Sequence, residues 1–118
     1  MKGKHWKMSD VAERDTKQRR ANDCANLVRR SNRKINLLRY STSETIKHRT
    51  LKEQVCIDII KQGKSFICEA IFETGGIADV LCLEDFVACE CVVSEKEKSL
   101  HEKNRKYPAG IKIEVVRA

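Results

Sequence analysis

The most constraining feature of this sequence is a run of three short apolar segments, residues 65–72, 77–83 and 86–93, separated only by tight turns. Segments of seven or eight residues rich in β-branched and aromatic side chains are typical of strands, and such short connections join antiparallel neighbours. Gly75-Gly76 suits the first turn, and a Glu-Asp pair at 84–85 is expected to form the second. The sequence therefore predicts an antiparallel three-stranded meander.

Helical patterns surround this meander. Residues 9–39 carry apolar side chains at steps of three and four, and residues 42–62 follow with their own apolar stripe after a capping-box pattern. After the meander, residues 94–107 form a polar helical pattern and residues 111–116 a last strand. This order predicts an α/β (α+β) domain with helices around one mixed sheet.

The positive charge of the chain belongs to its first half. The net charge is +7, but residues 1–50 carry fourteen Lys and Arg against five Asp and Glu, whereas residues 51–118 carry ten against twelve. Such a basic segment suits a polyanion, with nucleic acid ahead of an anionic membrane; a solvated basic face without a ligand is the alternative. We divide the chain into a basic helical arm, residues 1–41, and an α/β core domain, residues 42–118. The expected nucleic-acid contacts in the arm are Arg19, Arg20, Arg29, Arg30, Arg33, Lys34 and Arg39.

Several classes of protein are not expected. The six cysteines form no C-x-x-C pair and have no histidine nearby in sequence, so they are predicted to be reduced core thiols rather than zinc ligands. No apolar run approaches the roughly 20 residues that span a bilayer, and the charged start is not a secretory signal. There is no phosphate-binding glycine loop, so a nucleotide cofactor is not expected. We predict a soluble protein of the cytoplasm (of the host, if viral) with no membrane partner.

Two carboxylates, Asp79 and Glu90, lie inside the second and third apolar segments. If the turn between them has two residues, facing positions have numbers that add up to 169, and Asp79 stands opposite Glu90. Like charges at facing positions are destabilising, but two carboxylates about 5 Å apart can share a divalent cation that activates water against a phosphate. A longer turn would shift the register and turn one acid to solvent. A third acid, Glu53, lies near the apolar stripe of the preceding helix.

The order helix–βββ–helix–β, with "GGIADVL" and "FVACECVVSE", resembles the PD-(D/E)xK nuclease superfamily, especially archaeal Holliday-junction resolvases and related small archaeal or viral nucleases. The resemblance covers residues 44–116 and implies a restriction-endonuclease-like core. It also implies an Mg²⁺- or Mn²⁺-dependent endonuclease, a hydrolase acting on DNA such as branched or junction DNA. The implied metal ligands are Glu53, Asp79 and Glu90, with the carbonyl of Cys91 as a further ligand.

The chain departs from this family at Val92, which stands where the family has a lysine. Lys96 and Lys103 lie on one face of the following helical pattern and are candidate replacements. The segment "KNRKY" resembles the Q-x-x-x-Y element of RecB-type members, which adds Tyr107 to the expected nucleic-acid contacts. Alternatively the lysine is lost, and the protein binds nucleic acid without cutting it. A third hypothesis is a protein-interaction module whose N-terminal helix joins two copies into a homodimer.

Overall fold

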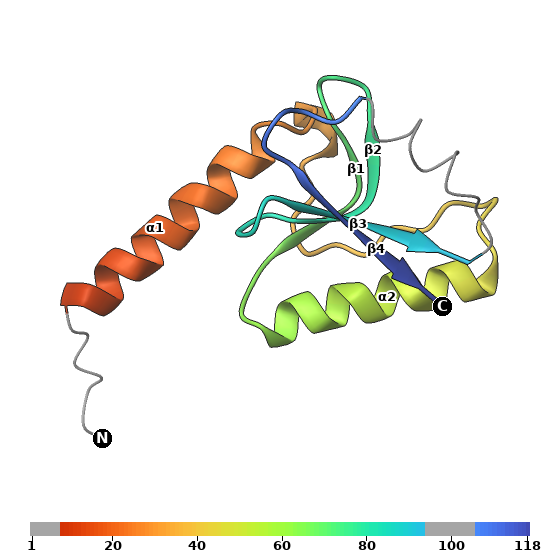
Figure 1. Ribbon diagram of the computed structural model, residues 1–118, viewed down its shortest axis with the longest axis horizontal. Helices are drawn as coiled ribbons and strands as arrows, with labels where there is room; N and C mark the ends of the chain where they lie inside the picture. The colour runs from red at the N-terminus through yellow and green to blue at the C-terminus, as the bar shows by residue number, and fades with distance from the viewer. Residues whose placement is uncertain (1–7, 94–105) are drawn as a thin grey trace.

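The computed structural model describes residues 8–93 and 106–118 of the 118-residue chain. Within these residues two α-helices, one short 3-10 helix and four strands form an α+β domain with one mixed sheet (Figure 1). The helical elements are α1 (Met8–Ala25), η1 (Arg30–Asn32) and α2 (Ile46–Lys61). The strands are β1 (Phe66–Ile71), β2 (Ile77–Cys82), β3 (Val87–Val92) and β4 (Lys112–Arg117). None of the helices in the described part of the chain is long and apolar enough to cross a membrane.

The four strands lie in the order β1-β2-β3-β4. The first three are antiparallel neighbours, and β4 returns parallel to β3, so the predicted meander and last strand are confirmed. Val80 pairs with Cys89 and Cys82 with Val87, so the numbers add up to 169 as expected for the second hairpin. This β2–β3 ladder ends at Val80, one residue short of Asp79.

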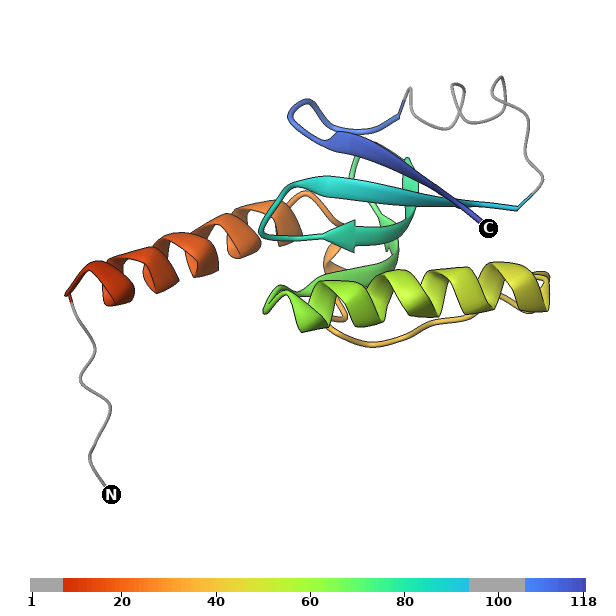
Figure 2. The same cartoon turned by 60° about the horizontal axis from the view of Figure 1, so that its bottom comes forward.

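The sheet has a core on each face. On one face α2 packs along the strands (Figure 2). On the other face the last turns of α1 pack against β1, β2 and the second hairpin. All six cysteines are buried free thiols, as expected, and five of them lie in the α2-side core. The α2-side core is formed by Val55, Cys56, Ile59, Phe66, Cys68, Val80, Cys82, Cys89 and Cys91.

The N-terminal helix is shorter than the sequence predicted, because α1 ends at Ala25 instead of continuing to residue 39. Residues 26–45 form an irregular connection that contains only the short η1. Val28 and Ile35 of this connection form isolated bridges with residues of β1 and just beyond it, so the connection lies along the outer edge of the sheet. The prediction of one basic helix over residues 9–39 is therefore wrong for its second half. The arginines of that half lie on this connection.

Two asparagine side chains explain where the helix stops. Asn32 Oδ1 accepts a hydrogen bond from the N–H of Ile71 at 2.7 Å, and Asn36 Oδ1 accepts one from the N–H of Phe66 at 3.0 Å. Asn36 adopts φ 58°, a left-handed conformation that asparagine tolerates better than most residues. Asparagine side chains compete with helical hydrogen bonds in this way. The amides thus satisfy edge donors of β1 that a continued helix would leave exposed.

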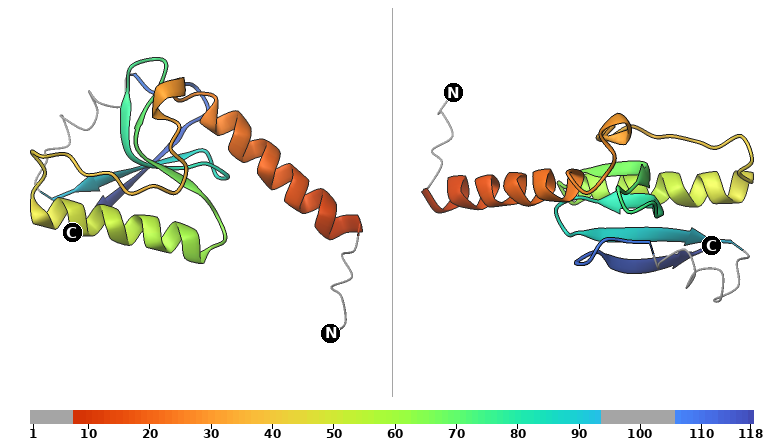
Figure 3. Two further views of the ribbon diagram at one scale, coloured as in Figure 1. Left: turned by 180° about the vertical axis from the view of Figure 1, so that it is seen from behind. Right: turned by 90° about the horizontal axis from the view of Figure 1, so that it is seen from above.

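The first turns of α1 project away from the sheet (Figures 1 and 3), and this part of the helix is polar but not basic. Residues 12–20 are exposed, and among residues 11–25, where burial is described, only Ala21, Cys24 and Ala25 enter the core. The helix carries four Lys and Arg and four Asp and Glu, whereas residues 26–49 carry seven against one. Because residues 21–36 share a core and an edge with the strands, the boundary at residue 41 does not separate two structural units.

The start of α2 also differs from the expectation. The N-cap is Thr45, whose hydroxyl accepts a hydrogen bond from the N–H of His48 at 3.2 Å. The predicted capping residues form their own turn before the helix, in which the N–H of Ser41 donates to Glu44 Oε1 at 2.6 Å. Gly63, with φ 73°, follows the end of α2.

Tyr107 packs on the first hairpin turn. Its ring meets Phe72 edge-on with centroids 5.1 Å apart, and its hydroxyl donates to the carbonyl of Ile77 at 2.9 Å. A Cβ at Gly76 would come within 2.5 Å of the Tyr107 ring, so the glycine is required by this contact. Tyr107 therefore has a packing role, and the helix predicted over residues 94–107 lies almost entirely outside the described residues, as do Lys96 and Lys103.

Candidate functional site

The ladder between β1 and β2 is interrupted at its middle. It pairs Cys68 with Val80 and resumes two residues further along β1, skipping Glu69 and Asp79, which occupy facing positions. Glu69 adopts φ 53°, a left-handed conformation that is strained for a residue other than glycine. The side chains change faces here, since Cys68 belongs to the α2-side core and Ala70 to the opposite one. The interruption allows two neighbouring positions of each strand to face α2.

Five polar residues meet at this interruption, and we call them the polar cluster: Glu44, His48, Lys52, Glu69 and Asp79. Lys52 Nζ donates to Glu69 Oε1 at 2.6 Å, and His48 Nε2 lies 3.5 Å from Asp79 Oδ2. His48 and Lys52 are four residues apart on α2, so both lie on the helix face that meets the sheet, and Glu44 lies in the turn that precedes the helix.

Lys52 is the centre of the polar cluster. Its side chain is fully buried, and its ammonium donates to Glu44 Oε1 and Glu69 Oε1, each at 2.6 Å. A buried ammonium is strongly destabilising unless it is paired in this way. Burial acts to lower the pKa of Lys52, but the hydrogen bonds to Glu44 and Glu69 outweigh it and the pKa is raised. Lys52 is therefore a charged lysine in the protein interior.

His48 and Glu44 form the second ion pair of the polar cluster, with His48 Nδ1 2.6 Å from Glu44 Oε2. Burial acts to raise the pKa of Glu44, but hydrogen bonds from Lys52, the N–H of Ser41 and His48 lower it to about 2. For His48, burial acts to lower the pKa, while the hydrogen bond to Glu44 and the charge of Asp79 raise it above its usual value. Both pKa shifts favour the charged form of the group.

The predicted pairing of Asp79 with Glu90 is not the one found. Asp79 Oδ2 accepts a hydrogen bond from the N–H of Cys91 at 2.8 Å and faces α2 through His48. Glu90 is buried between Cys89 and Cys91, whose side chains lie in the α2-side core, so strand alternation directs Glu90 to the other face. The physical reason is that the β2–β3 ladder stops one pair early. The acid that faces Asp79 across the sheet is Glu69 of β1.

Glu53 also lies apart from the polar cluster. It is exposed on α2, where its Oε2 accepts a hydrogen bond from the hydroxyl of Tyr40 at 3.1 Å. The sheet-facing side of α2 is occupied by His48, Lys52 and Val55, so Glu53 points away from it. Sequence reasoning therefore found one residue of the polar cluster, Asp79, and missed four: Glu44, His48, Lys52 and Glu69.

The predicted basic contacts divide into two groups. Arg20 donates to the carbonyl of Glu84 at 3.0 Å, and Arg33 donates to the carbonyl of Val28 at 2.8 Å, so both help to hold the fold. Arg19 is exposed on the neutral α1. The remaining four are exposed along the connection beside β1: Arg29, Arg30, Lys34 and Arg39.

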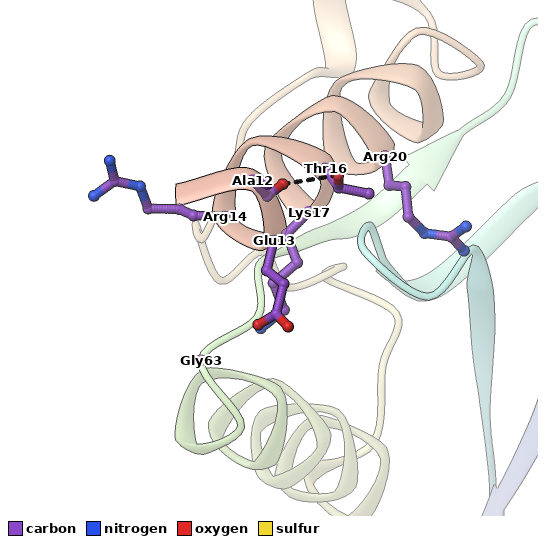
Figure 4. Close-up of a pocket in the computed structure, with 7 residues that line it drawn as sticks. All are labelled: Ala12, Glu13, Arg14, Thr16, Lys17, Arg20 and Gly63. Carbon is purple, nitrogen blue, oxygen red and sulfur yellow. Dashed lines mark hydrogen bonds between the residues drawn. The ribbon is translucent and has the colours of Figure 1, made fainter. Parts of the chain in front are cut away.

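A different cleft lies between α1 and the turn after α2 (Figure 4). It is open, with a volume of about 790 Å³, and its lining includes Glu13, Lys17, Arg20 and Gly63. Its charges have mixed sign, and none of its lining residues belongs to the polar cluster. We therefore place the candidate site at the polar cluster.

The polar cluster can be tested for its fit to a divalent cation. Among residues 8–93 and 106–118, no three His, Cys, Asp or Glu side chains are grouped as a metal site. Mg²⁺, however, is often held by only one or two carboxylates together with water and substrate phosphate. Glu69 and Asp79 are partly exposed, at 26% and 14%, and Glu69 Oε2 and Asp79 Oδ1 take part in none of the hydrogen bonds among the described residues. These two oxygens fit such a two-carboxylate site.

The geometry of the polar cluster is the basis for interpreting function. It combines three carboxylates, a buried lysine and a histidine at a strained point of the sheet. The chain matches no family model, no curated protein and no solved structure.

Proposed function

We propose that this protein is a divalent-metal-dependent nuclease that acts on DNA at the polar cluster. The observation that carries the proposal is the facing pair Glu69 and Asp79 on the α2 side of the interrupted ladder. Like charges at facing positions destabilise a sheet, and the left-handed conformation of Glu69 adds strain. Retention of two facing carboxylates and a strained backbone at one partly exposed point is typical of a functional site.

The residues of the polar cluster have distinct roles in this proposal. A bound Mg²⁺ or Mn²⁺ would supply the activated water and polarise the phosphate. Glu69 and Asp79 would hold the cation through Glu69 Oε2 and Asp79 Oδ1. Lys52 would serve as the lysine missing at Val92, because its ammonium pairs with Glu44 and Glu69 and holds both carboxylates in position. The mixed sheet with helical packing on both faces supports a restriction-endonuclease-like core for the same proposal.

Binding of nucleic acid without hydrolysis is the second candidate. It is favoured by the close pairing of Lys52, since an ammonium 2.6 Å from both Glu44 and Glu69 already supplies a cation to two of the three carboxylates. In that case the polar cluster would fasten α2 to the sheet, and the basic connection would provide the binding surface.

Metal titration and cleavage assays on single-residue variants test the proposal. We expect Mn²⁺ at a hundredfold excess over its dissociation constant to increase the free energy of unfolding of the wild type by about 2.7 kcal/mol. The melting temperature should rise accordingly. Asp79→Asn and Glu69→Gln should remove that stabilisation and reduce DNA cleavage by about a hundredfold or more. Glu53→Gln is the matched control, because Glu53 lies outside the polar cluster and should leave both measurements unchanged.

The outcomes separate the two candidates. DNA binding without Mn²⁺ stabilisation or cleavage would establish the second candidate instead of the nuclease. Loss of cleavage in Glu53→Gln with normal cleavage in Glu69→Gln would place the metal at the residues predicted from sequence. Absence of DNA binding would contradict both candidates.

A further inference from the structure

Residues 29–40 run beside the outer edge of β1 (Figure 3). They carry both basic and apolar side chains. Four of the basic side chains are exposed, Arg29, Arg30, Lys34 and Arg39, and so are several large apolar side chains that a folded domain would usually cover. Ile35 and Leu37 are each 51% exposed, Leu38 is 38% exposed and Tyr40 is 46% exposed. We call residues 29–40 the basic-apolar strip.

An apolar groove adjoins the basic-apolar strip. It lies between the strip and the second half of α2, is open to solvent and has a volume of about 260 Å³. Leu38 lines it from the strip, and Ile57, Ile60 and Lys61 line it from α2. Ile57 and Ile60 are themselves 39% and 47% exposed. The groove therefore offers apolar surface with positive charge at its rim.

The charge around this surface selects a polyanion. Residues 26–49 carry seven Lys and Arg against one acid, Glu44, and Glu44 is already paired with Lys52 and His48. Basic side chains in such excess bind phosphates and release their counterions. An acidic protein partner would meet the same charges, but it would not require the exposed apolar side chains that follow them at residues 35–40.

The apolar members decide between double- and single-stranded DNA. A duplex keeps the faces of its bases stacked inside the helix, so Leu37, Leu38 and Tyr40 would find only phosphates and sugars. A single strand offers unstacked bases, which pack on aromatic and apolar side chains while the backbone follows basic groups. We propose that the basic-apolar strip and the adjoining groove bind single-stranded DNA.

The basic-apolar strip leads to the polar cluster. Tyr40, its last residue, lies with its ring 5.4 Å from Lys52 Nζ and 5.5 Å from the guanidinium carbon of Arg49. The next residue, Ser41, donates its N–H to Glu44 of the cluster. A single strand that follows the strip therefore arrives at the carboxylates. This inference rests on the proposed nuclease function and names its substrate class as single-stranded DNA.

Binding is tested with the full chain in EDTA, so that cleavage does not occur. Fluorescence anisotropy compares a labelled oligothymidylate of about 16 nucleotides, a length suited to one small domain, with a hairpin duplex of equal phosphate number. We expect the single strand to bind at least about tenfold more tightly, because the bases of the duplex are not available to stack on the protein. Leu38→Ser combined with Ile60→Ser should lower single-strand affinity about tenfold and duplex affinity less than about twofold.

Ile113→Ser is the matched control. Ile113 is 40% exposed, much like Leu38 and Ile60, but lies on β4 at the opposite edge of the sheet. It should change neither affinity, and melting curves should show all three proteins folded, because exposed positions tolerate such changes.

The opposite results would overturn the inference. Duplex binding as tight as single-strand binding, or equal losses for both DNAs in the double variant, would show that the apolar side chains do not contact bases. A double variant that changes the sedimentation coefficient but not single-strand affinity would assign the groove to a homodimer interface. Binding and metal-dependent cleavage of duplex DNA would support the proposed nuclease function but contradict the preference for single strands. Failure to bind either DNA would contradict the proposed function as well.

Discussion

At the scale of single residues, Lys52 determines how α2 is oriented on the sheet. Its ammonium joins Glu44, which precedes the helix, to Glu69 of β1, so one side chain connects two elements. Removing one partner of a buried pair leaves an uncompensated charge and typically costs about 3–5 kcal/mol. Rotation of α2 by one residue would separate these groups. The helix is therefore oriented by charge as well as by its apolar contacts with Cys68 and Val80.

The same residues predict how stability depends on pH. The pKa of Glu44 falls from 4.5 to about 2 on folding, so its contribution is present above about pH 4.5 and is lost as pH falls toward 2. The pKa of His48 is raised from 6.5, so its contribution is present below about pH 6.5 and is lost as pH rises through the higher folded value. Thermal unfolding across pH should show greatest stability between about pH 4.5 and 6.5.

Two variants assign the limbs of that curve. Glu44→Gln should reduce the loss of stability in acid, which for the wild type amounts to at most about 3 kcal/mol from this group. His48→Gln should flatten the decline above neutrality. Some acid sensitivity should persist in Glu44→Gln, because Lys64 also lowers the pKa of Asp85. An unchanged acid limb in Glu44→Gln would show that the polar cluster does not control stability.

The residue scale is also where sequence reasoning was least complete. Asp79 was found because a carboxylate inside an apolar segment stands out, and Glu69 carries the same signal in the segment before it. What the sequence does not contain is the left-handed conformation of Glu69, which turns both acids toward α2. The regular alternation of strands predicted Glu90 as the partner, and an interrupted ladder made Glu69 the partner instead.

At the scale of elements, the strands were predicted within one or two residues and the first helix was not. Three apolar segments joined by tight turns leave little choice of topology, so the meander was accessible from sequence. The stretch from Val28 to Leu38 has helical spacing as well, yet the structure extends it along β1. Asn32 and Asn36 decide the outcome through tertiary hydrogen bonds to Ile71 and Phe66, which periodicity alone does not reveal.

This difference changes which element is expected to bind DNA. The charges of α1 cancel, whereas those of the basic-apolar strip do not. We expect Arg30→Gln with Lys34→Gln to reduce the dependence of log affinity for single strands on log salt by about 1.4, since each lost phosphate contact removes about 0.7. The matched pair Lys17→Gln with Arg19→Gln on α1 should leave the slope unchanged, because acidic neighbours on the same helix offset these charges.

Affinity measured at several salt concentrations gives these slopes directly. A larger change from the α1 pair than from the strip pair would instead place the main phosphate contacts on α1.

At the scale of the whole molecule, the two halves of the sequence form one structural unit. Residues from α1 and the connection share the core on one face with β1, β2 and the second hairpin. The change in charge near residue 50 suggested a boundary between an arm and a domain, but charge describes the surface and not the core. The molecule thus carries its positive surface on a segment that also completes its sheet edge.

Because all six cysteines are buried, their reaction with thiol reagents can measure how often the structure opens. Burial raises the pKa of the Cys24, Cys89 and Cys91 thiols to about 12, and that of Cys82 to about 11, so these sulfurs hardly ionise near neutrality. Because an exposed thiolate is the nucleophile that attacks alkylating reagents, labelling in the native state requires the protein to open. Iodoacetamide pulses read by peptide mass spectrometry should therefore modify these four slowly and at one common rate.

Cys68 should be labelled at a different rate from these four cysteines. Its sulfur lies 3.4 Å from the carbonyl of Arg39, so detachment of the connection from β1 uncovers it while the rest of the core stays closed. Early labelling of Cys68 would measure the lifetime of the sheet edge separately from that of the whole fold. Labelling of every cysteine at the same rate would instead mean that the sheet edge and the core open only together. In that case the basic-apolar strip would be rigid before any DNA binds to it.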